Sequence, residues 1–214
     1  MRYSELIFSP TGGTQKVADI IAEGWGADWE TADLTDASAD FSRIVFQKED
    51  LVLIAVPSYG GRVPEPAIQR LEQIHGNGAR CILVCVYGNR AYEDTLIELN
   101  DTAEKCGFQV LAAVAAIAEH SILHQYAAGR PNRQDEESLR SAVEKIREKW
   151  NSASETPVQL PGNRPYKKAG GGGLVPKAGK NCVNCGLCAA QCPVQAISRA
   201  NVQNTDAKKC ISCM

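Results

Sequence analysis

The sequence lacks the long apolar run and the excess positive charge that would favour a membrane or a nucleic acid as its partner. Its net charge is −2, and no uninterrupted apolar stretch approaches the roughly 18 residues that cross a bilayer. A near-neutral balance argues against a nucleic-acid binder built on bulk positive charge. The N-terminal residues also lack the charged, apolar and cleavage regions of a signal peptide, so we expect a cytoplasmic protein.

Two nucleotide-binding signatures are absent as well. No glycine-rich loop ends in the Gly-Lys-Ser/Thr of a Walker motif, and no G-x-G-x-x-G follows the first predicted strand, so dinucleotide binding loses support. Histidine is scarce, with three residues in the chain, and none lies near the cysteine-rich C-terminus. A zinc knuckle usually takes two separated cysteine pairs, often helped by histidine, and the closely spaced cysteine run without a nearby histidine disfavours it.

Strand-like and helix-like patterns alternate through the first 150 residues. The stretch 50–58 is almost entirely apolar, which is typical of a strand buried on both faces of a parallel sheet. Predicted strands lie at 4–9, 29–34, 50–58, 79–88 and 108–118, and predicted helices lie at 14–25, 66–75, 91–107 and 135–150. This alternation implies right-handed crossovers and favours a doubly wound α/β domain with five strands.

The composition changes between residues 151 and 180, which are rich in proline, glycine and serine and show no periodicity. We interpret this segment as a linker or an extended arm packed along the surface. Within it, Gly170–Gly173 has no strand before it and no helix after it, so a spacer is favoured over a phosphate loop. The chain thus divides into a domain at 1–150, an arm at 151–180 and a cysteine-rich module at 181–214.

Nine cysteines fall into two groups. Cys81, Cys85 and Cys106 lie singly in apolar or helical patterns, and we expect them to be small buried hydrophobic residues. The others form two close runs in the C-terminal module, C-x2-C-x2-C-x3-C-P and a shorter C-x2-C. Bacterial ferredoxins hold [4Fe-4S] clusters with the longer run, in which the fourth cysteine ligates the other cluster. The predicted iron–sulfur ligands are Cys182, Cys185, Cys188, Cys192, Cys210 and Cys213.

Three loops follow the carboxyl ends of predicted strands, where open α/β sheets bind ligands. The loop at 9–14 combines hydroxyl residues with glycines at the start of a helix, which suits a phosphate, although a plain turn and helix cap is the alternative. The loops at 57–66 and 87–94 each place tyrosine beside glycine. A tyrosine can stack on a flat heterocycle and glycine permits close approach, although a lone loop tyrosine is more often half-buried packing.

These loops, S-P-T-G-G-T, P-S-Y-G-G-R-V-P and Y-G-N-R-A-Y, resemble in this order the phosphate loop and the two isoalloxazine loops of flavodoxins. With the C-terminal ferredoxin run, the whole chain resembles the flavodoxin–ferredoxin fusion proteins called ferrodoxins. The resemblance implies FMN at the carboxyl edge of a sheet ordered 2-1-3-4-5. The implied phosphate ligands are Ser9, Thr11, Gly12, Gly13 and Thr14. The implied neighbours of the ring are Ser58, Tyr59, Gly60 and Gly61 on one side and Tyr87, Gly88, Asn89 and Tyr92 on the other.

The implied function is an electron-transfer flavoprotein that relays single electrons between FMN, [4Fe-4S] clusters and redox partner proteins, with no catalytic acid or base. One alternative is a flavin-dependent reductase of a quinone-like acceptor, in which His120 helps to border the substrate pocket. Another is a binding module without a redox role. We interpret His120-Ser121 primarily as a hydrogen-bonding feature at a strand end.

Many flavodoxins are strongly acidic around the flavin, whereas this chain has a nearly balanced charge and places Arg62 and Arg90 beside the predicted site. We expect these cations to raise the potential of the flavin hydroquinone couple.

In a two-cluster module, each site would retain three of its four ligands within this sequence. The first site would use Cys182, Cys185 and Cys188, and the second would use Cys192, Cys210 and Cys213, each with one further cysteine. We therefore expect a C-terminally truncated sequence, with a natural single-cluster variant as the alternative. We also expect FMN to be held more firmly than the clusters.

Overall fold

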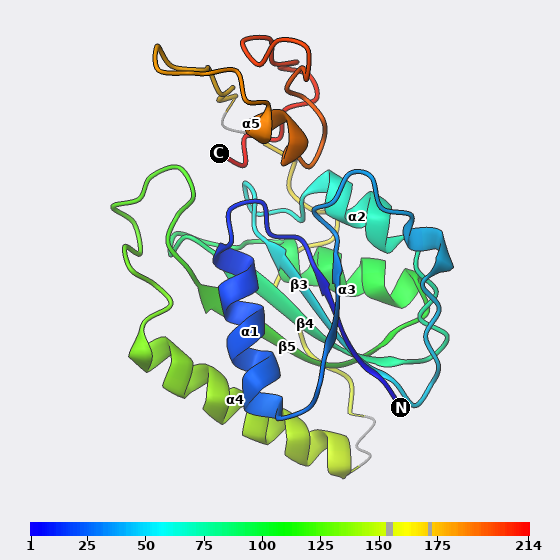
Figure 1. The fold of residues 1–214 in the computed structure, drawn as a ribbon. Coiled ribbons are helices and arrows are strands. Elements are labelled where there is room, and N and C mark those ends of the chain that lie inside the picture. The colour runs from blue at the N-terminus through cyan, green and yellow to red at the C-terminus, as the bar shows by residue number, and fades with distance from the viewer. Residues whose placement is uncertain (153–155, 171–172) are drawn as a thin grey trace.

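A computed structural model describes residues 1–152, 156–170 and 173–214 of the chain. Its core is a five-stranded sheet with the order β2-β1-β3-β4-β5 and parallel pairing throughout, so the predicted fold class is confirmed. Figure 1 shows the sheet between two helical layers. The strands are β1 (Tyr3–Ile7), β2 (Glu30–Asp33), β3 (Leu51–Pro57), β4 (Arg80–Tyr87) and β5 (Gln109–Ile117). The helices of the domain are α1 (Gly13–Trp25), α2 (Glu65–Leu71), α3 (Thr95–Lys105) and α4 (Arg133–Asn151), with a 3-10 turn η1 (Phe41–Arg43).

The central strand β3 is buried on both faces, as its apolar sequence predicts. Leu51 and Leu53 point toward the helices α1 and α4, where they pack with residues such as Val17. Val52 and Ile54 point the opposite way, into the core beneath α2 and α3. This alternation follows from the two-residue period of a strand, and it gives the sheet one hydrophobic core on each side.

Two helices differ from their predicted bounds by four residues at one end, and the other two differ by one or two residues. The helix α2 ends at Leu71 because the following residues pair elsewhere: the amide of His75 donates to Ile44 O at 3.1 Å. The helix α3 begins at Thr95, four residues later than predicted, because the segment before it forms a loop. The amide of Asp94 donates to Gly61 O at 3.0 Å, which ties that loop to the one after β3.

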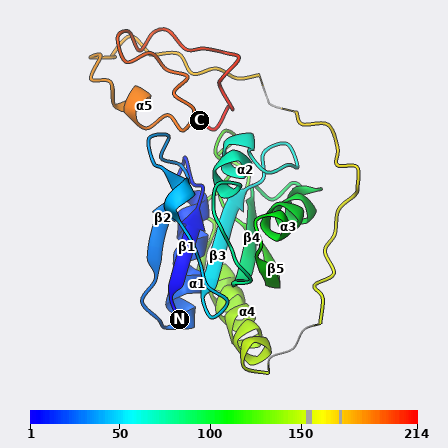
Figure 2. The same ribbon diagram turned by 90° about the vertical axis from the view of Figure 1, so that its right-hand side faces the viewer.

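The cysteine-rich module lies over the carboxyl edge of the sheet (Figure 1), and contains one short helix, α5 (Leu187–Ala190). The described part of the arm, 156–170, passes along the side of the domain that carries α3 (Figure 2). Residues 153–155 of the predicted linker and 171–172 of the glycine run lie outside the described residues. In the part of the chain that is described, no helix is both long enough and apolar enough to cross a membrane.

Candidate functional site

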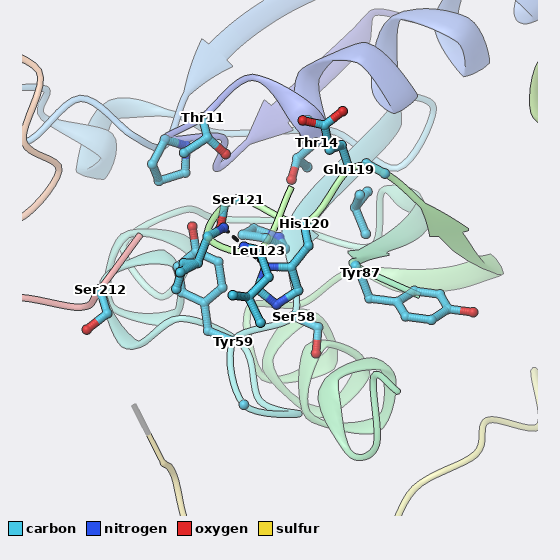
Figure 3. A pocket seen from close by; sticks show the side chains of 18 of the residues that line it. Thr11, Thr14, Ser58, Tyr59, Tyr87, Glu119, His120, Ser121, Leu123 and Ser212 are labelled. Atoms are coloured by element: carbon cyan, nitrogen blue, oxygen red, sulfur yellow. Dashed lines mark hydrogen bonds between the residues drawn. The ribbon is translucent and has the colours of Figure 1, made fainter. Parts of the chain in front are cut away.

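A cavity of about 370 Å³ opens at the carboxyl edge of the sheet, where the loops after β1, β3, β4 and β5 meet the C-terminal module. Its size falls in the range of small-molecule sites. Figure 3 shows the side chains that surround it. Of the residues that the sequence assigns to FMN, those lining the cavity are Thr11, Gly13, Thr14, Ser58, Tyr59, Gly60, Tyr87 and Gly88.

The predicted phosphate loop connects β1 to α1. Gly12 adopts a φ of 83°, a left-handed conformation that favours glycine, just before the first helical turn. The backbone amides of Gly13 and Thr14 lie in that turn, where an α-helix supplies no acceptor of its own. Ser9 is used differently: its hydroxyl accepts the amide of Gln15 at 3.0 Å. Ser9 and Gly12 therefore shape the loop, while Thr11, Gly13 and Thr14 line the cavity.

The first predicted ring loop is a tight hairpin. The amide of Tyr59 donates to Arg62 O at 3.0 Å and the amide of Arg62 returns to Tyr59 O at 3.2 Å. The two residues between them, Gly60 and Gly61, both have positive φ, which such a two-residue turn requires. The loop presents Tyr59 and Gly60 to the cavity, while Gly61 turns the chain away from it. Ser58 joins the loop to α3, with its hydroxyl 2.7 Å from that of Thr95.

The second predicted ring loop contributes Tyr87 and Gly88 to the cavity. Tyr92 packs edge-on against Tyr87, with ring centroids 5.1 Å apart, and contacts the hydrophobic core instead of the cavity. Asn89 occupies a turn position with a φ of 63°, which asparagine tolerates better than most residues. The structure therefore assigns packing and turn roles to Tyr92 and Asn89, and Tyr87 is the tyrosine of this loop that lines the cavity.

A fourth loop, after β5, was not among the predicted flavin loops, although the sequence singles out His120-Ser121 at this strand end. His120 lines the cavity, and its Nδ1 accepts the amides of Ile122 at 3.1 Å and Leu123 at 3.2 Å. This is the predicted strand-end hydrogen bonding, and in the neutral ring it leaves the proton on Nε2. The loop packs closely on Gly88, since a Cβ at Gly88 would lie 2.8 Å from the Cβ of His120.

The end of the arm and the C-terminal module complete the cavity wall. Leu174, Ile211 and Ser212 line it together with the loops of the domain, and the hydroxyl of Ser212 donates to Leu174 O at 2.7 Å. Burial raises the pKa of Tyr59, and negative charge on Cys213 raises it further. Cys213 thus lies close to a tyrosine of the first ring loop. No local pattern could have revealed this proximity, because it involves residues far apart in the sequence.

The cavity residues fit FMN in their chemistry. Free amides at the start of α1 suit a phosphate, two tyrosines offer faces for a flat ring, and Gly60 and Gly88 allow the backbone to approach it closely. Burial raises the pKa of Tyr87, with Tyr92 adding to the effect, so its phenol stays protonated at neutral pH.

The six C-terminal cysteines are free thiols, exposed or half-buried. Backbone amides donate to some of these sulfur atoms: Asn184 to Cys182 Sγ at 3.4 Å and Ala196 to Cys192 Sγ at 3.2 Å. Burial raises the pKa of Cys213, and the nearby Cys192 and Cys210 each raise it further, so Cys213 lies within electrostatic range of both. They are the three cysteines that the sequence assigns to the second cluster. Across the described ranges, no three metal-binding side chains form a preassembled site. The donors fit a cluster, and their final arrangement would form as it binds.

Neither of the two arginines beside the predicted site lines the cavity. The guanidinium of Arg62 forms an ion pair with Glu98, with an Nη2–Oε1 distance of 2.5 Å. Arg90 is largely exposed and pairs with Glu93 at 2.9 Å. A paired cation exerts a smaller net field than a free one, so this arrangement opposes the expected effect on the flavin potential.

The small net charge of the chain conceals an uneven distribution. Residues 1–150 contain 15 Lys or Arg and 23 Asp or Glu, whereas residues 151–214 contain 8 and 2. The domain is therefore acidic when considered alone, and the arm and module are basic. The apparent departure from the acidic character of flavodoxins comes from the C-terminal segment.

Comparisons with known proteins find similarity to two kinds of protein. A family model for 4Fe-4S binding domains matches residues 180–198. A flavodoxin from Streptococcus pneumoniae TIGR4 is similar in structure, with a TM-score of 0.50 and 19% identity over 70% of this chain and 99% of that one. Flavodoxin 1 from Bacillus cereus has a TM-score of 0.48 and 15% identity over 69% of this chain and 98% of that one. A sequence search of curated proteins returns no match. The chain has a flavodoxin-like domain followed by a 4Fe-4S ferredoxin-type segment.

Proposed function

We propose that this flavodoxin-like domain and its 4Fe-4S segment form an electron-transfer flavoprotein. FMN would occupy the cavity at the carboxyl edge of the sheet, and the C-terminal cysteines would hold [4Fe-4S] clusters. The protein would relay single electrons between these groups and redox partner proteins. We also expect it to work in the cytoplasm, because close cysteine runs suggest metal ligands in a reducing compartment.

The observation that carries this proposal is the shared wall of the cavity. Ile211 and Ser212 lie between two predicted cluster ligands and line the same cavity as Tyr59 and Tyr87. A covalent tether that places the two cofactor sites together raises their effective concentration, so electrons can pass without an encounter between molecules. FMN exchanges electrons singly or in pairs, whereas a cubane cluster exchanges one at a time.

The residues of the chain would hold and shield FMN. The first turn of α1 would bind the phosphate through the amides of Gly13 and Thr14, with Thr11 beside them. Tyr59 and Tyr87 would flank the ring, and the C-terminal segment would exclude water from the edge that faces the module. No residue is needed as a catalytic acid or base.

The reductase alternative rests on one observation, that His120 borders the cavity beside both tyrosines. A small acceptor would have to enter a cavity that the C-terminal segment partly closes. The alternative therefore predicts saturable turnover of a quinone, whereas the relay predicts none.

A cofactor count on anaerobically purified protein tests the proposal. We expect bound FMN and iron in the wild type, and less iron with unchanged FMN in Cys192→Ser and Cys213→Ser. The control Cys106→Ser removes a thiol that donates to Leu71 O at 3.3 Å inside the domain, and should keep both cofactors. A colourless protein that takes up no added FMN would contradict the proposal and favour a binding module.

A further inference from the structure

We propose that residues 162–167 of the arm, here called the strap, position the two predicted ring-binding loops of the domain. This inference rests on the proposed FMN site and deepens it. The strap does not line the cavity, so it would act through the loops that do. In this reading the arm is a structural part of the flavin site and more than a spacer between two modules.

The firmest attachment of the strap is to Asp94, which precedes α3 and is 2% exposed. Its carboxylate accepts the amide of Asn163 at 2.8 Å, the side-chain amide of Asn163 at 3.1 Å and the amide of Lys167 at 2.7 Å. The amide of Asp94 in turn donates to Gly61 O at 3.0 Å. A single residue thus joins the strap to both ring loops.

The strap also contacts the first ring loop directly, through Arg62. The Nη1 of Arg62 donates to Lys167 O at 2.6 Å, and its guanidinium lies 4.9 Å from the ring centroid of Tyr166. The other side of the guanidinium pairs with Glu98, which is 3% exposed and also accepts the amide of Val63 at 2.8 Å. Arg62 is therefore held between α3 and the strap, and the hairpin that bears Tyr59 is held with it.

Charge complementarity supports this docking. Asp94, Glu98 and Asp101 are spaced four and three residues apart, so they lie on one side of α3, from its N-cap to its middle. Arg164 donates from Nε to Asp101 Oδ2 at 2.8 Å, and the hydroxyl of Tyr166 donates to the same oxygen at 2.5 Å. These contacts give the basic arm a defined position along an acidic helix.

A second ion pair reaches the other ring loop. The Nζ of Lys167 contacts a carboxylate oxygen of Glu93, in the segment that follows Tyr87. The same lysine supplies the amide bound by Asp94 and the carbonyl bound by Arg62. Lys167 therefore contacts residues of both ring loops.

The strap enters this position through a glycine. Gly162 has a φ of 135°, and a Cβ there would lie 2.8 Å from the Cβ of Ile97 on α3. An alanine at this position would be strained and would push the strap away from α3. Gly179, in the same arm, offers a matched control, because a Cβ there meets nothing within 4 Å and its φ is not positive.

Two measurements on the full chain test the proposal. The first is the Kd for added FMN, measured by quenching of flavin fluorescence. The second is hydrogen exchange of the amides at 88–95 in FMN-free protein. We expect Gly162→Ala to weaken FMN binding about tenfold, which corresponds to about 1.4 kcal/mol, and to speed exchange at 88–95. Gly179→Ala should change neither.

A graded pair of variants separates positioning from global unfolding. Tyr166→Phe keeps the ring beside Arg62 and loses only the bond to Asp101, so its effect should be smaller than that of Tyr166→Ala. Unchanged exchange at 88–95 in both Gly162→Ala and Tyr166→Ala would overturn the proposal. If the wild type binds no FMN, the proposed function fails, while hydrogen exchange still tests whether the strap orders the loops.

Discussion

The carboxylate of Asp94 accepts the backbone amide of Lys167 at 2.7 Å, across 73 residues of sequence. This bond joins the loop after β4, which helps to form the cavity, to the arm that leads to the cysteine module. Because Asp94 also binds Gly61 O through its own amide, it connects three segments. The geometry of the predicted flavin site therefore depends on residues outside the flavodoxin-like domain.

The strap contacts predict a pH dependence of stability. The hydrogen bond from Arg164 is the main cause that lowers the pKa of Asp101. A carboxyl group whose pKa is lower in the folded than in the unfolded state stabilises the fold. This stabilisation is complete above the pKa of the unfolded state, about 3.9, and is lost as the pH falls through the pKa of the folded state. Urea unfolding should therefore show a stability difference between wild type and Asp101→Asn that is constant from about pH 7 to 5 and shrinks below about pH 4. A difference that persists unchanged at lower pH would contradict this assignment.

The two arginines beside the site should behave differently. Arg62→Gln leaves Glu98 buried without its cation, and breaking a buried pair costs about 3–5 kcal/mol. Since the side chain of Arg62 is 20% exposed, we expect the lower end of that range. Arg90→Gln removes an exposed pair and should cost at most about 1 kcal/mol. Chemical denaturation measures both changes. Equal losses in the two variants would contradict the roles assigned here.

Gly88 should be needed for the close packing of the second ring loop on the loop after β5. An added Cβ would lie 2.6 Å from Cδ2 of His120, so Gly88→Ala should displace the histidine ring into the cavity. We expect FMN affinity to fall at least tenfold, while Gly179→Ala keeps the wild-type affinity. FMN titration followed by flavin fluorescence measures both. An unchanged affinity in Gly88→Ala would show that the cavity does not bind the ring in the proposed way.

Much of the fold could be predicted from the sequence because the relevant signals are local. The apolar run of β3 and the glycine-rich turns at the ends of the strands depend on neighbouring residues, and they located the sheet and three of the loops around the cavity. The late start of α3 could not be predicted in this way. Its first residues carry a helical pattern, but the bond from Asp94 to Gly61 O holds them in a loop.

The residues of the candidate site that the sequence did not predict depend on contacts between segments far apart in the chain. Leu174, near the end of the arm, and Ser212, in the module, reach the cavity only through the position of the whole C-terminal part of the chain. Asn163 and Lys167 lie in a segment whose composition is typical of a linker, and hydrogen bonds to Asp94, just before α3, hold them in place. Composition alone does not distinguish such a docked arm from a free one.

FMN should be retained longer than iron when a chelator is added under anaerobic conditions. Each predicted cluster site has three cysteines in this sequence, and a cluster with three protein ligands is held less firmly than one with four. FMN, in contrast, would be surrounded by loops that the fold preassembles. Parallel assays of iron and flavin during chelation measure the order of loss. Two [4Fe-4S] clusters per chain that survive the treatment would contradict this expectation.

The most direct test of the account is whether electrons pass between the module and the cavity within one chain. After anaerobic reconstitution, a one-electron reductant is added and flavin absorbance is followed by stopped flow at several protein concentrations. We predict that flavin reduction in the wild type includes a phase whose rate is independent of protein concentration. In Cys192→Ser/Cys213→Ser that phase should be lost, while Cys106→Ser retains it. The same flavin reduction rate in all three proteins would contradict the central claim.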